Sequence, residues 1–161
     1  MKMKVIAMLA AFALTASAVQ AQELPRKVQN VDLDGKPVKL PYFGEKNLMI
    51  FYVDPDRHKQ NEDFTIELEQ NHRAESDNIH GFGVMNLKDA PMVPNGMARN
   101  MAKKRTAKNG ATVLADQNRI LSTAWALGDC NNQFVLMIVS KEGELVFLRK
   151  GELSDADKEA F

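Results

Sequence analysis

The pattern of hydrophobic and polar positions along the chain predicts a hairpin followed by a buried strand. Residues 31–33 and 38–40 both alternate hydrophobic and polar side chains. They flank Asp34-Gly35, and both residues of an Asp-Gly pair tolerate the positive φ of a two-residue hairpin turn. Residues 48–53 form an unbroken hydrophobic run, which is typical of a strand covered on both faces in a largely parallel sheet.

Helical and extended patterns then alternate to the end of the chain. Further strands are expected at 80–85, 112–114, 134–139 and 145–148, and helices at 56–73, 97–108, 120–127 and after the capping residue Ser154. Buried parallel strands that are joined by crossover helices, with an antiparallel pair at the end, form a layered α/β protein. The order therefore predicts a three-layer α/β sandwich with a central mixed sheet, an N-terminal β-hairpin and helices on both faces.

The first 21 residues have the pattern of an export signal. Two lysines make the start basic, residues 5–14 are hydrophobic without interruption, and small residues follow. This run is shorter than the roughly 20 residues that a membrane-spanning helix needs. We therefore expect export, cleavage after Ala21 and no stable insertion in the membrane, with residues 22–27 as a polar leader and 28–161 as one domain.

Composition and charge exclude several classes of function. The chain has 161 residues, with 21 Lys and Arg against 21 Asp and Glu, so it has no net charge to attract nucleic acid. Its single cysteine, Cys130, excludes an internal disulfide, a four-cysteine metal centre and the two-thiol chemistry of an oxidoreductase that works alone. We expect no cofactor.

Several segments resemble known proteins in their order and spacing. Residues 47–69 resemble the second strand and first helix of a thioredoxin fold, and residues 114–118 and 134–151 resemble the closing half of peroxiredoxin-like and TlpA-like proteins. Shorter motifs are similar to the YtfJ-type family of small exported thioredoxin-like proteins of Gram-negative bacteria: Asn86, Asp89-Ala90, Pro94-Asn95-Gly96-Met97, Ala115-Asp116-Gln117-Asn118 and Ser140-Lys141-Glu142-Gly143-Glu144. The resemblance implies a thioredoxin-like domain located in the periplasm.

The resemblance does not extend to thiol chemistry. Thioredoxins place Cys-x-x-Cys at the start of the helix that follows this strand, and the matching positions here read Asp56-Arg57-His58-Lys59. Phe134 stands approximately where the fold carries its cis-proline. YtfJ-type proteins share both absences. The resemblance therefore implies the fold but not disulfide exchange or peroxidase activity. We expect a binding or accessory protein for an unknown periplasmic protein or small anionic ligand, rather than an enzyme.

The start of the helix expected from residue 56 is the first candidate site. A helix N-terminus attracts anions because its first N–H groups are unpaired. The candidate residues are Tyr52, Asp54, Asp56, Arg57, His58 and Lys59. The basic side chains would add donors above Tyr52, and the aspartates would cap the helix. The alternatives are a self-capped helix with a solvated first turn, and a divalent-metal site of Asp54, Asp56 and His58 whose spacing matches no standard site.

Cys130 gives an alternative, enzymatic hypothesis. In a thioredoxin-like fold the loop that holds it, residues 128–132, faces the N-terminus of the first helix, so a pair with His58 is conceivable. An imidazolium within about 4 Å would favour the thiolate and create a monothiol nucleophile. The simpler interpretations are a small loop residue without chemistry and a Cys130-linked dimer.

The methionines give a third hypothesis, copper handling. Met92, Met97 and Met101 cluster in the sequence, and soft thioethers suit Cu(I). Met97 and Met101 are also four residues apart on a predicted helix, and methionine commonly fills irregular space in a protein core. Core packing is therefore the alternative interpretation.

Overall fold

The computed structural model describes residues 23–33, 38–90, 94–110 and 112–161. Its strands are β1 (Arg26–Lys27), β2 (Asp32–Leu33), β3 (Val38–Lys39), β4 (Asn47–Val53), β5 (Ile79–Asn86), β6 (Val113–Asp116), β7 (Phe134–Val139) and β8 (Glu144–Lys150). Its helices are the 3₁₀ turn η1 (Pro55–Arg57), α1 (Glu62–Gln70), α2 (Asn95–Asn109), α3 (Ile120–Ala124) and α4 (Asp155–Glu159). No helix in these ranges is long and apolar enough to cross a membrane. The predicted export signal lies outside the described residues.

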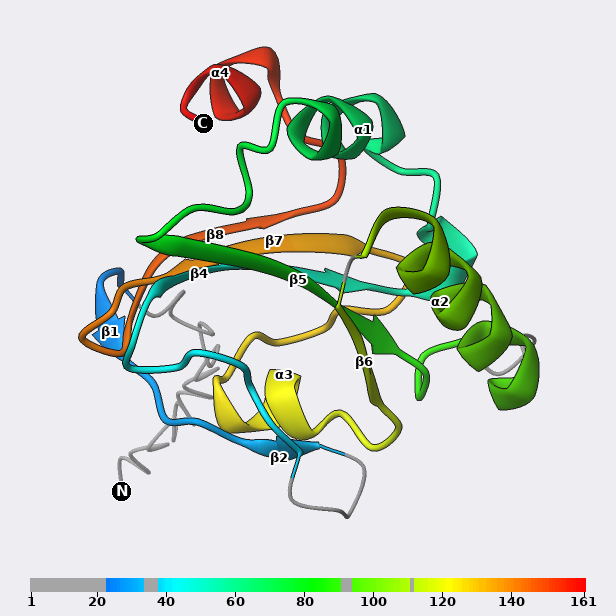
Figure 1. The fold of residues 1–161 in the computed structure, drawn as a ribbon. Coiled ribbons are helices and arrows are strands. Elements are labelled where there is room, and N and C mark those ends of the chain that lie inside the picture. The colour runs from blue at the N-terminus through cyan, green and yellow to red at the C-terminus, as the bar shows by residue number, and fades with distance from the viewer. Residues whose placement is uncertain (1–22, 34–37, 91–93, 111) are drawn as a thin grey trace, which may run out of the picture.

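Six strands form one mixed sheet in the order β1-β8-β7-β4-β5-β6 (Figure 1). β4, β5 and β6 run parallel, whereas β7 pairs antiparallel with β4 and β8, and β1 pairs antiparallel with β8. The two continuous hydrophobic runs of the sequence, β4 and β7, lie side by side in the middle of the sheet, where both faces of a strand are covered. The strands predicted for this sheet are confirmed, but β1 was not predicted, because Arg26 and Lys27 lie in the expected polar leader.

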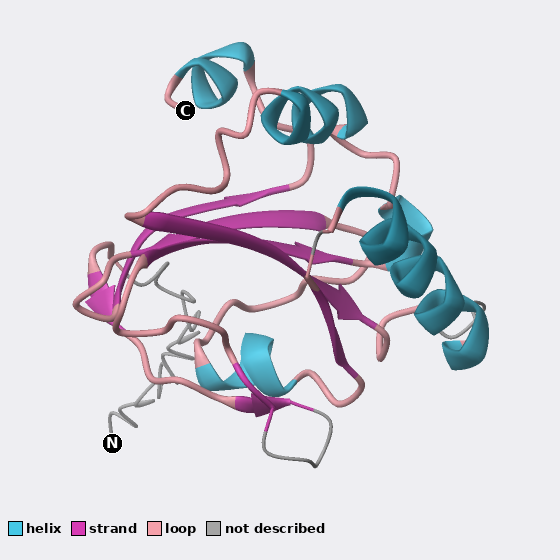
Figure 2. Cartoon of the chain, viewed as in Figure 1, coloured by secondary structure: helices cyan, strands magenta, loops and turns pink. Residues whose placement is uncertain are grey.

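Helices cover both faces of the sheet (Figures 1 and 2). α1 and α4 lie on one face, and α3 lies on the other face together with β2. At the start of α4, Ser154 accepts a hydrogen bond from the N–H of Asp157 and forms a capping box with it, as predicted for a capping residue. The predicted three-layer α/β sandwich is thus confirmed.

The N-terminal hairpin forms a separate two-stranded sheet of β2 and β3. Leu33 pairs with Val38, so the four residues 34–37 separate the paired positions. The expected two-residue turn is therefore wrong, because this register leaves a four-residue connection between the strands. The predicted turn residues, Asp34-Gly35, lie outside the described residues.

The long helix expected at 56–73 is divided into two parts. Pro55–Arg57 form a single 3₁₀ turn, and α1 begins only at Glu62. Asn61 has φ 59° and ψ 25°, in the left-handed region, and this conformation separates the turn from α1. The predicted start of the helix is therefore wrong. Glu62 and Asp63 instead complement the positive end of α1.

Alternate residues of each strand enter two hydrophobic clusters, one on each face of the sheet. On the face covered by α3, here called the closed face, large side chains pack around Trp125. Those from the central strands are Leu48, Ile50, Tyr52, Phe82, Val84, Val135, Met137 and Val139. The face covered by α1 and α4 is here called the pocket face. Its smaller buried cluster contains Met49, Phe64, Leu68, Phe134, Leu136 and Leu153.

Candidate functional site

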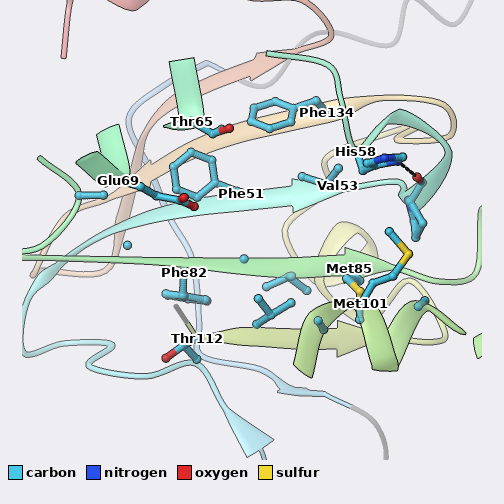
Figure 3. A pocket seen from close by; sticks show the side chains of 18 of the residues that line it. Phe51, Val53, His58, Thr65, Glu69, Phe82, Met85, Met101, Thr112 and Phe134 are labelled. Atoms are coloured by element: carbon cyan, nitrogen blue, oxygen red, sulfur yellow. Dashed lines mark hydrogen bonds between the residues drawn. The ribbon is translucent and has the colours of Figure 1, made fainter. Parts of the chain in front are cut away.

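The pocket face contains a cavity of about 350 Å³ between the sheet and the helices α1 and α2 (Figure 3). Small-molecule pockets begin at about 300 Å³, so the cavity has room for a small ligand or one large side chain. Its lining is mainly hydrophobic and includes Phe51, Val53, Leu68, Ala98, Val113 and Phe134. Four polar side chains complete it: His58, Thr65, Glu69 and Thr112.

Two glycines of β5 border this cavity, and they differ in the room beside them. Gly81, Phe82, Gly83 and Val84 all border it, but Phe82 and Val84 also belong to the buried cluster of the closed face. A Cβ added at Gly81 would lie 2.7 Å from both Cβ and O of Ala74, so a neighbour occupies the room beside this residue. A Cβ added at Gly83 would lie 3.8 Å from its nearest atom, which is ordinary contact. Gly83 therefore keeps open a space that a side chain would enter.

Helix α2 covers the pocket through small side chains. Ala98 is buried and Ala102 is half-buried, and both line the cavity. The larger Met97 and Met101 are 57% and 45% exposed, although Met101 also reaches the cavity. Because Ala98 and Ala102 have small side chains, α2 borders the cavity without filling it.

His58 is a predicted site residue that does reach the pocket. It lies in the turn after η1, is exposed, and lines the cavity beside Pro55. Its Nδ1 lies 2.9 Å from the carbonyl oxygen of Pro55. Arg57 and Lys59 are also exposed, but the helix N-terminus around which they were to bind an anion lies farther along the chain, at Glu62. The structure therefore lacks the geometry of the predicted anion site.

Asp54 is a structural residue at the end of β4. Its side chain is fully buried, with Oδ1 accepting from the N–H of Asp56 (2.9 Å) and Oδ2 from the N–H of Asn132 (2.8 Å). Burial raises the pKa of the Asp54 carboxyl, and the two amide hydrogen bonds oppose that rise. Asp54 thus caps the 3₁₀ turn η1 and not α1, the helix it was expected to cap. A metal site with Asp56 and His58 is not formed, and no group of three His, Cys, Asp or Glu side chains in the described ranges is arranged to hold a metal ion.

Tyr52 does not lie beneath His58, because its side chain belongs to the closed face. It is fully buried, and its hydroxyl donates to Oδ2 of Asp116 at 3.1 Å. The same carboxylate accepts from the N–H groups of Ile120 (2.8 Å) and Leu121 (2.9 Å), so it holds the start of α3. Burial and the nearby Asp116 raise the pKa of Tyr52, which keeps the phenol protonated as a donor.

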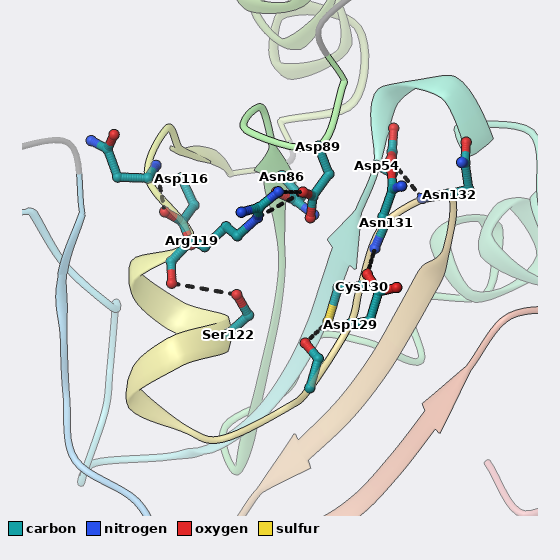
Figure 4. A network of polar contacts seen from close by, with 12 residues as sticks. Asp54, Asn86, Asp89, Asp116, Arg119, Ser122, Asp129, Cys130, Asn131 and Asn132 are labelled. Carbon is teal, nitrogen blue, oxygen red and sulfur yellow. Dashed lines mark hydrogen bonds and ion pairs between the residues drawn. The ribbon is translucent and has the colours of Figure 1, made fainter.

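A second polar group joins the end of β5 to the start of α3 (Figure 4). Asn86 donates from Nδ2 to Oδ2 of Asp89 at 2.6 Å, and Nε of Arg119 donates to Oδ1 of Asp89 at 2.7 Å. Burial acts to raise the pKa of Asp89, but the hydrogen bonds from Arg119 and Asn86 outweigh it and lower that pKa. These contacts fix the loops at the carboxyl ends of the parallel strands.

Cys130 lies in the loop between α3 and β7 (Figure 4). It is 2% exposed and packs on the closed face, in the cluster around Trp125. Burial raises the pKa of its thiol to about 11, and the ammonium of Lys150 opposes this only in part. The predicted pair with His58 is wrong, because His58 lines the cavity on the opposite face of the sheet. A disulfide to a second chain would first require the loop around Cys130 to open.

The two described methionines of the copper hypothesis, Met97 and Met101, differ in their surroundings. Met97 is exposed on α2, Met101 reaches the pocket, and Met92 lies outside the described residues. The alternative interpretation, in which these methionines pack in the core, is therefore wrong for Met97. Met85, which no sequence pattern singles out, lines the same cavity as Met101.

Sequence reasoning misses the hydrophobic side chains that line the pocket, such as Phe51 and Val53. One signal for them is present in the chain. Gly81 and Gly83 occupy alternate positions of a predicted strand, and alternate residues point to the same face. Two glycines two residues apart thus indicate a strand with one face locally bare of side chains.

Solved structures that are similar to this chain have a thioredoxin-like fold. The exposed lipoprotein thioredoxin of Streptococcus pneumoniae matches 84% of this chain and 96% of its own, with a TM-score of 0.57 and 17% identity. A DsbF homologue of Corynebacterium diphtheriae matches 85% of each chain, with a TM-score of 0.62 and 12% identity. A thiol:disulfide interchange protein of Chlorobium tepidum matches 87% of this chain and 95% of its own, with a TM-score of 0.54 and 16% identity.

No protein-family model and no curated protein matches the chain. At identities of 12–17% the structural likeness is one of fold. The chain therefore has a thioredoxin-like fold with a single, buried cysteine.

Proposed function

We propose that this chain is an exported thioredoxin-like binding protein whose pocket holds a hydrophobic group of a ligand or of a partner protein. The observation that carries the proposal is the hydrophobic cavity between the sheet, α1 and α2. His58 and Phe134 both line it, and these are positions that the resemblance aligns with the dithiol segment and the cis-proline of thioredoxins. The pocket thus borders the region where thioredoxins carry their reactive thiols.

The environment of Cys130 supports a binding function over the monothiol alternative. A nucleophilic cysteine needs a low pKa and access to its substrate. Cys130 has neither property, since its side chain is buried and its pKa is raised to about 11. Its Sγ lies 3.6 Å from the carbonyl oxygen of Gly128, where the thiol acts as a weak donor.

The export signal, periplasmic location and YtfJ-type membership are part of the same proposal. The basic start and the hydrophobic run of residues 5–14 support them. N-terminal sequencing of the protein recovered from a Gram-negative host tests export directly. We expect a periplasmic protein that begins at Gln22, whereas an uncleaved chain retained in the cytoplasm would contradict export.

The binding proposal is tested with N-phenylnaphthylamine, a neutral fluorophore whose emission rises in hydrophobic surroundings. The protein recovered after expression of the full chain should bind it. Gly83→Leu should abolish binding, because the new side chain enters the cavity without meeting an atom closer than 3.8 Å at its Cβ. Gly96→Leu makes the same replacement where no atom lies within 4 Å of the added Cβ, and it should bind like the wild type.

Two results would contradict the binding proposal. One is wild-type protein that does not bind the fluorophore, and the other is equal binding by Gly83→Leu. If Gly83→Leu fails to fold, the methyl resonances of Val53 and Val113 in the wild-type protein replace it as the readout. Both side chains line the cavity, so both resonances should shift when the fluorophore binds.

A further inference from the structure

Three side chains with nitrogen or sulfur donors line the same end of the pocket (Figure 3). His58 comes from the turn after η1, Met85 from β5, and Met101 from α2. His58 and Met85 are 27 positions apart in sequence, so only the fold brings them to one cavity. Neither methionine is needed to fill a closed core, because both border open space.

The hydrogen bond of His58 prepares its ring for a metal ion. Nδ1 lies 2.9 Å from the carbonyl oxygen of Pro55, which only accepts hydrogen bonds, so Nδ1 carries the proton of the neutral ring. The lone pair is then on Nε2. Histidines that bind metals commonly donate their other N–H to a backbone carbonyl in this way, which fixes both the tautomer and the ring orientation.

We propose that His58, Met85 and Met101 form a binding site for Cu(I), with Nε2 and two thioether sulfurs as donors. Soft thioethers select Cu(I), and imidazole is a good copper ligand. Ca²⁺ and Mg²⁺ require a set of oxygen ligands, which these three residues do not provide. The inference rests on the same pocket as the proposed function, but it names a different class of ligand. It also replaces two members of the sequence-based methionine cluster, Met92 and Met97, with Met85 and His58.

The test measures Cu(I) affinity under anaerobic conditions by competition with a chromophoric Cu(I) chelator. Ag(I) serves as a probe that does not change oxidation state. Met85→Leu, Met101→Leu and His58→Phe should each weaken binding at least about tenfold, since even losing a residue that only orients a metal ligand costs about 10- to 100-fold. Met97→Leu is the matched control, because Met97 lies on the same helix as Met101, is 57% exposed and does not line the cavity.

A second readout does not depend on the stability of the variants. In wild-type protein with labelled methionine methyl groups, Ag(I) should shift the resonances of Met85 and Met101 and leave that of Met97 in place. Cys130→Ala should keep its Cu(I) affinity, because the thiol is buried on the opposite face. Unshifted Met85 and Met101 resonances, or binding that is lost with Met97→Leu or Cys130→Ala, would overturn the copper site.

The two proposals can fail separately. Methionine and leucine have similar volumes, so Met85→Leu and Met101→Leu should still bind N-phenylnaphthylamine after they lose Cu(I). Wild-type protein that binds the fluorophore but no Cu(I) would refute the copper site and leave the binding proposal intact. Wild-type protein that binds Cu(I) but no fluorophore would refute the binding proposal and leave the copper site intact.

Discussion

The two faces of the sheet are made from the same strands but differ in what covers them. On the closed face, Phe82 and Val84 of β5 are buried, and a hydrogen bond from Tyr52 to Asp116 links the sheet to α3. On the pocket face, the alternating residues of β5 include Gly81 and Gly83, and a cavity of about 350 Å³ remains. The comparison predicts that side chains packed on the closed face contribute more to stability than side chains that border the cavity.

The largest expected effect comes from removing a ring of the closed face. Phe82 is 2% exposed, so Phe82→Ala should lower the free energy of unfolding by about 3–5 kcal/mol. Met85, on the same strand, borders an existing cavity, and Met85→Ala should cost only about 1 kcal/mol. Urea unfolding measures both values. Equal losses at the two positions would show that the faces do not differ in stability.

The second largest effect concerns the hydrogen bond between Tyr52 and Asp116, here called the polar link of the closed face. Asp116→Ala leaves the hydroxyl of Tyr52 and the N–H groups at the start of α3 without their acceptor, and it should cost about 3 kcal/mol. Asp116→Asn keeps one acceptor oxygen and should lose about half as much. Asp155→Ala, at an exposed position of α4, is the control and should change stability by about 0.5 kcal/mol or less. An Asp116→Ala variant with an unchanged free energy of unfolding would contradict a structural role for the polar link.

The two glycines of β5 should respond in opposite directions. Gly81→Ala places Cβ 2.7 Å from Ala74, including its backbone oxygen, and should destabilise by about 1–3 kcal/mol. Gly83→Ala meets only ordinary contacts and should stabilise by up to about 1 kcal/mol, because alanine loses less backbone freedom on folding. Thermal unfolding of the pair measures the difference. A clear loss with Gly83→Ala would mean that the cavity beside it is not open.

The last effect, which is absent at neutral pH, is the titration of Cys130. Because burial raises the pKa of this thiol from 9.0 to about 11, its alkylation in the folded protein should become fast only towards pH 11. The unfolded chain loses the proton first, so stability should fall as pH rises from about 9 to about 11 and should be independent of this group below that range. His58→Ala should change neither curve. The monothiol hypothesis would be restored if Cys130 had a low apparent pKa and His58→Ala raised it.

Local patterns in the sequence were sufficient for most of the fold. The hydrophobic runs of β4 and β7, the Ser154 cap and the helix that ends before Gly110 are each specified by neighbouring residues. Local patterns did not specify the start of α1, because the left-handed conformation of Asn61 has no strong sequence signal. That one residue moves the helix N-terminus away from Arg57, His58 and Lys59, which removes the predicted anion site.

The site depended on facts that no local pattern contains. Period-two alternation puts Tyr52 and Phe51 on opposite faces, but it does not say which face α1 or α3 will cover. The sequence alone therefore could not tell that Tyr52 would bond to Asp116, or that Cys130 and His58 would be separated by the sheet. It also could not bring Met85 and Met101 to one cavity.

The sequence by itself determined the order of strands β2 to β8 and helices α1 to α4 and the absence of a second thiol, because these depend on residue type and short-range spacing. It also determined which strands lie at the centre of the sheet, since only continuous hydrophobic runs tolerate burial on both faces. Only the tertiary structure decided that the cysteine would be buried and the pocket left open. Both outcomes depend on which helix packs on which face, and that choice is made by contacts between residues distant in the chain.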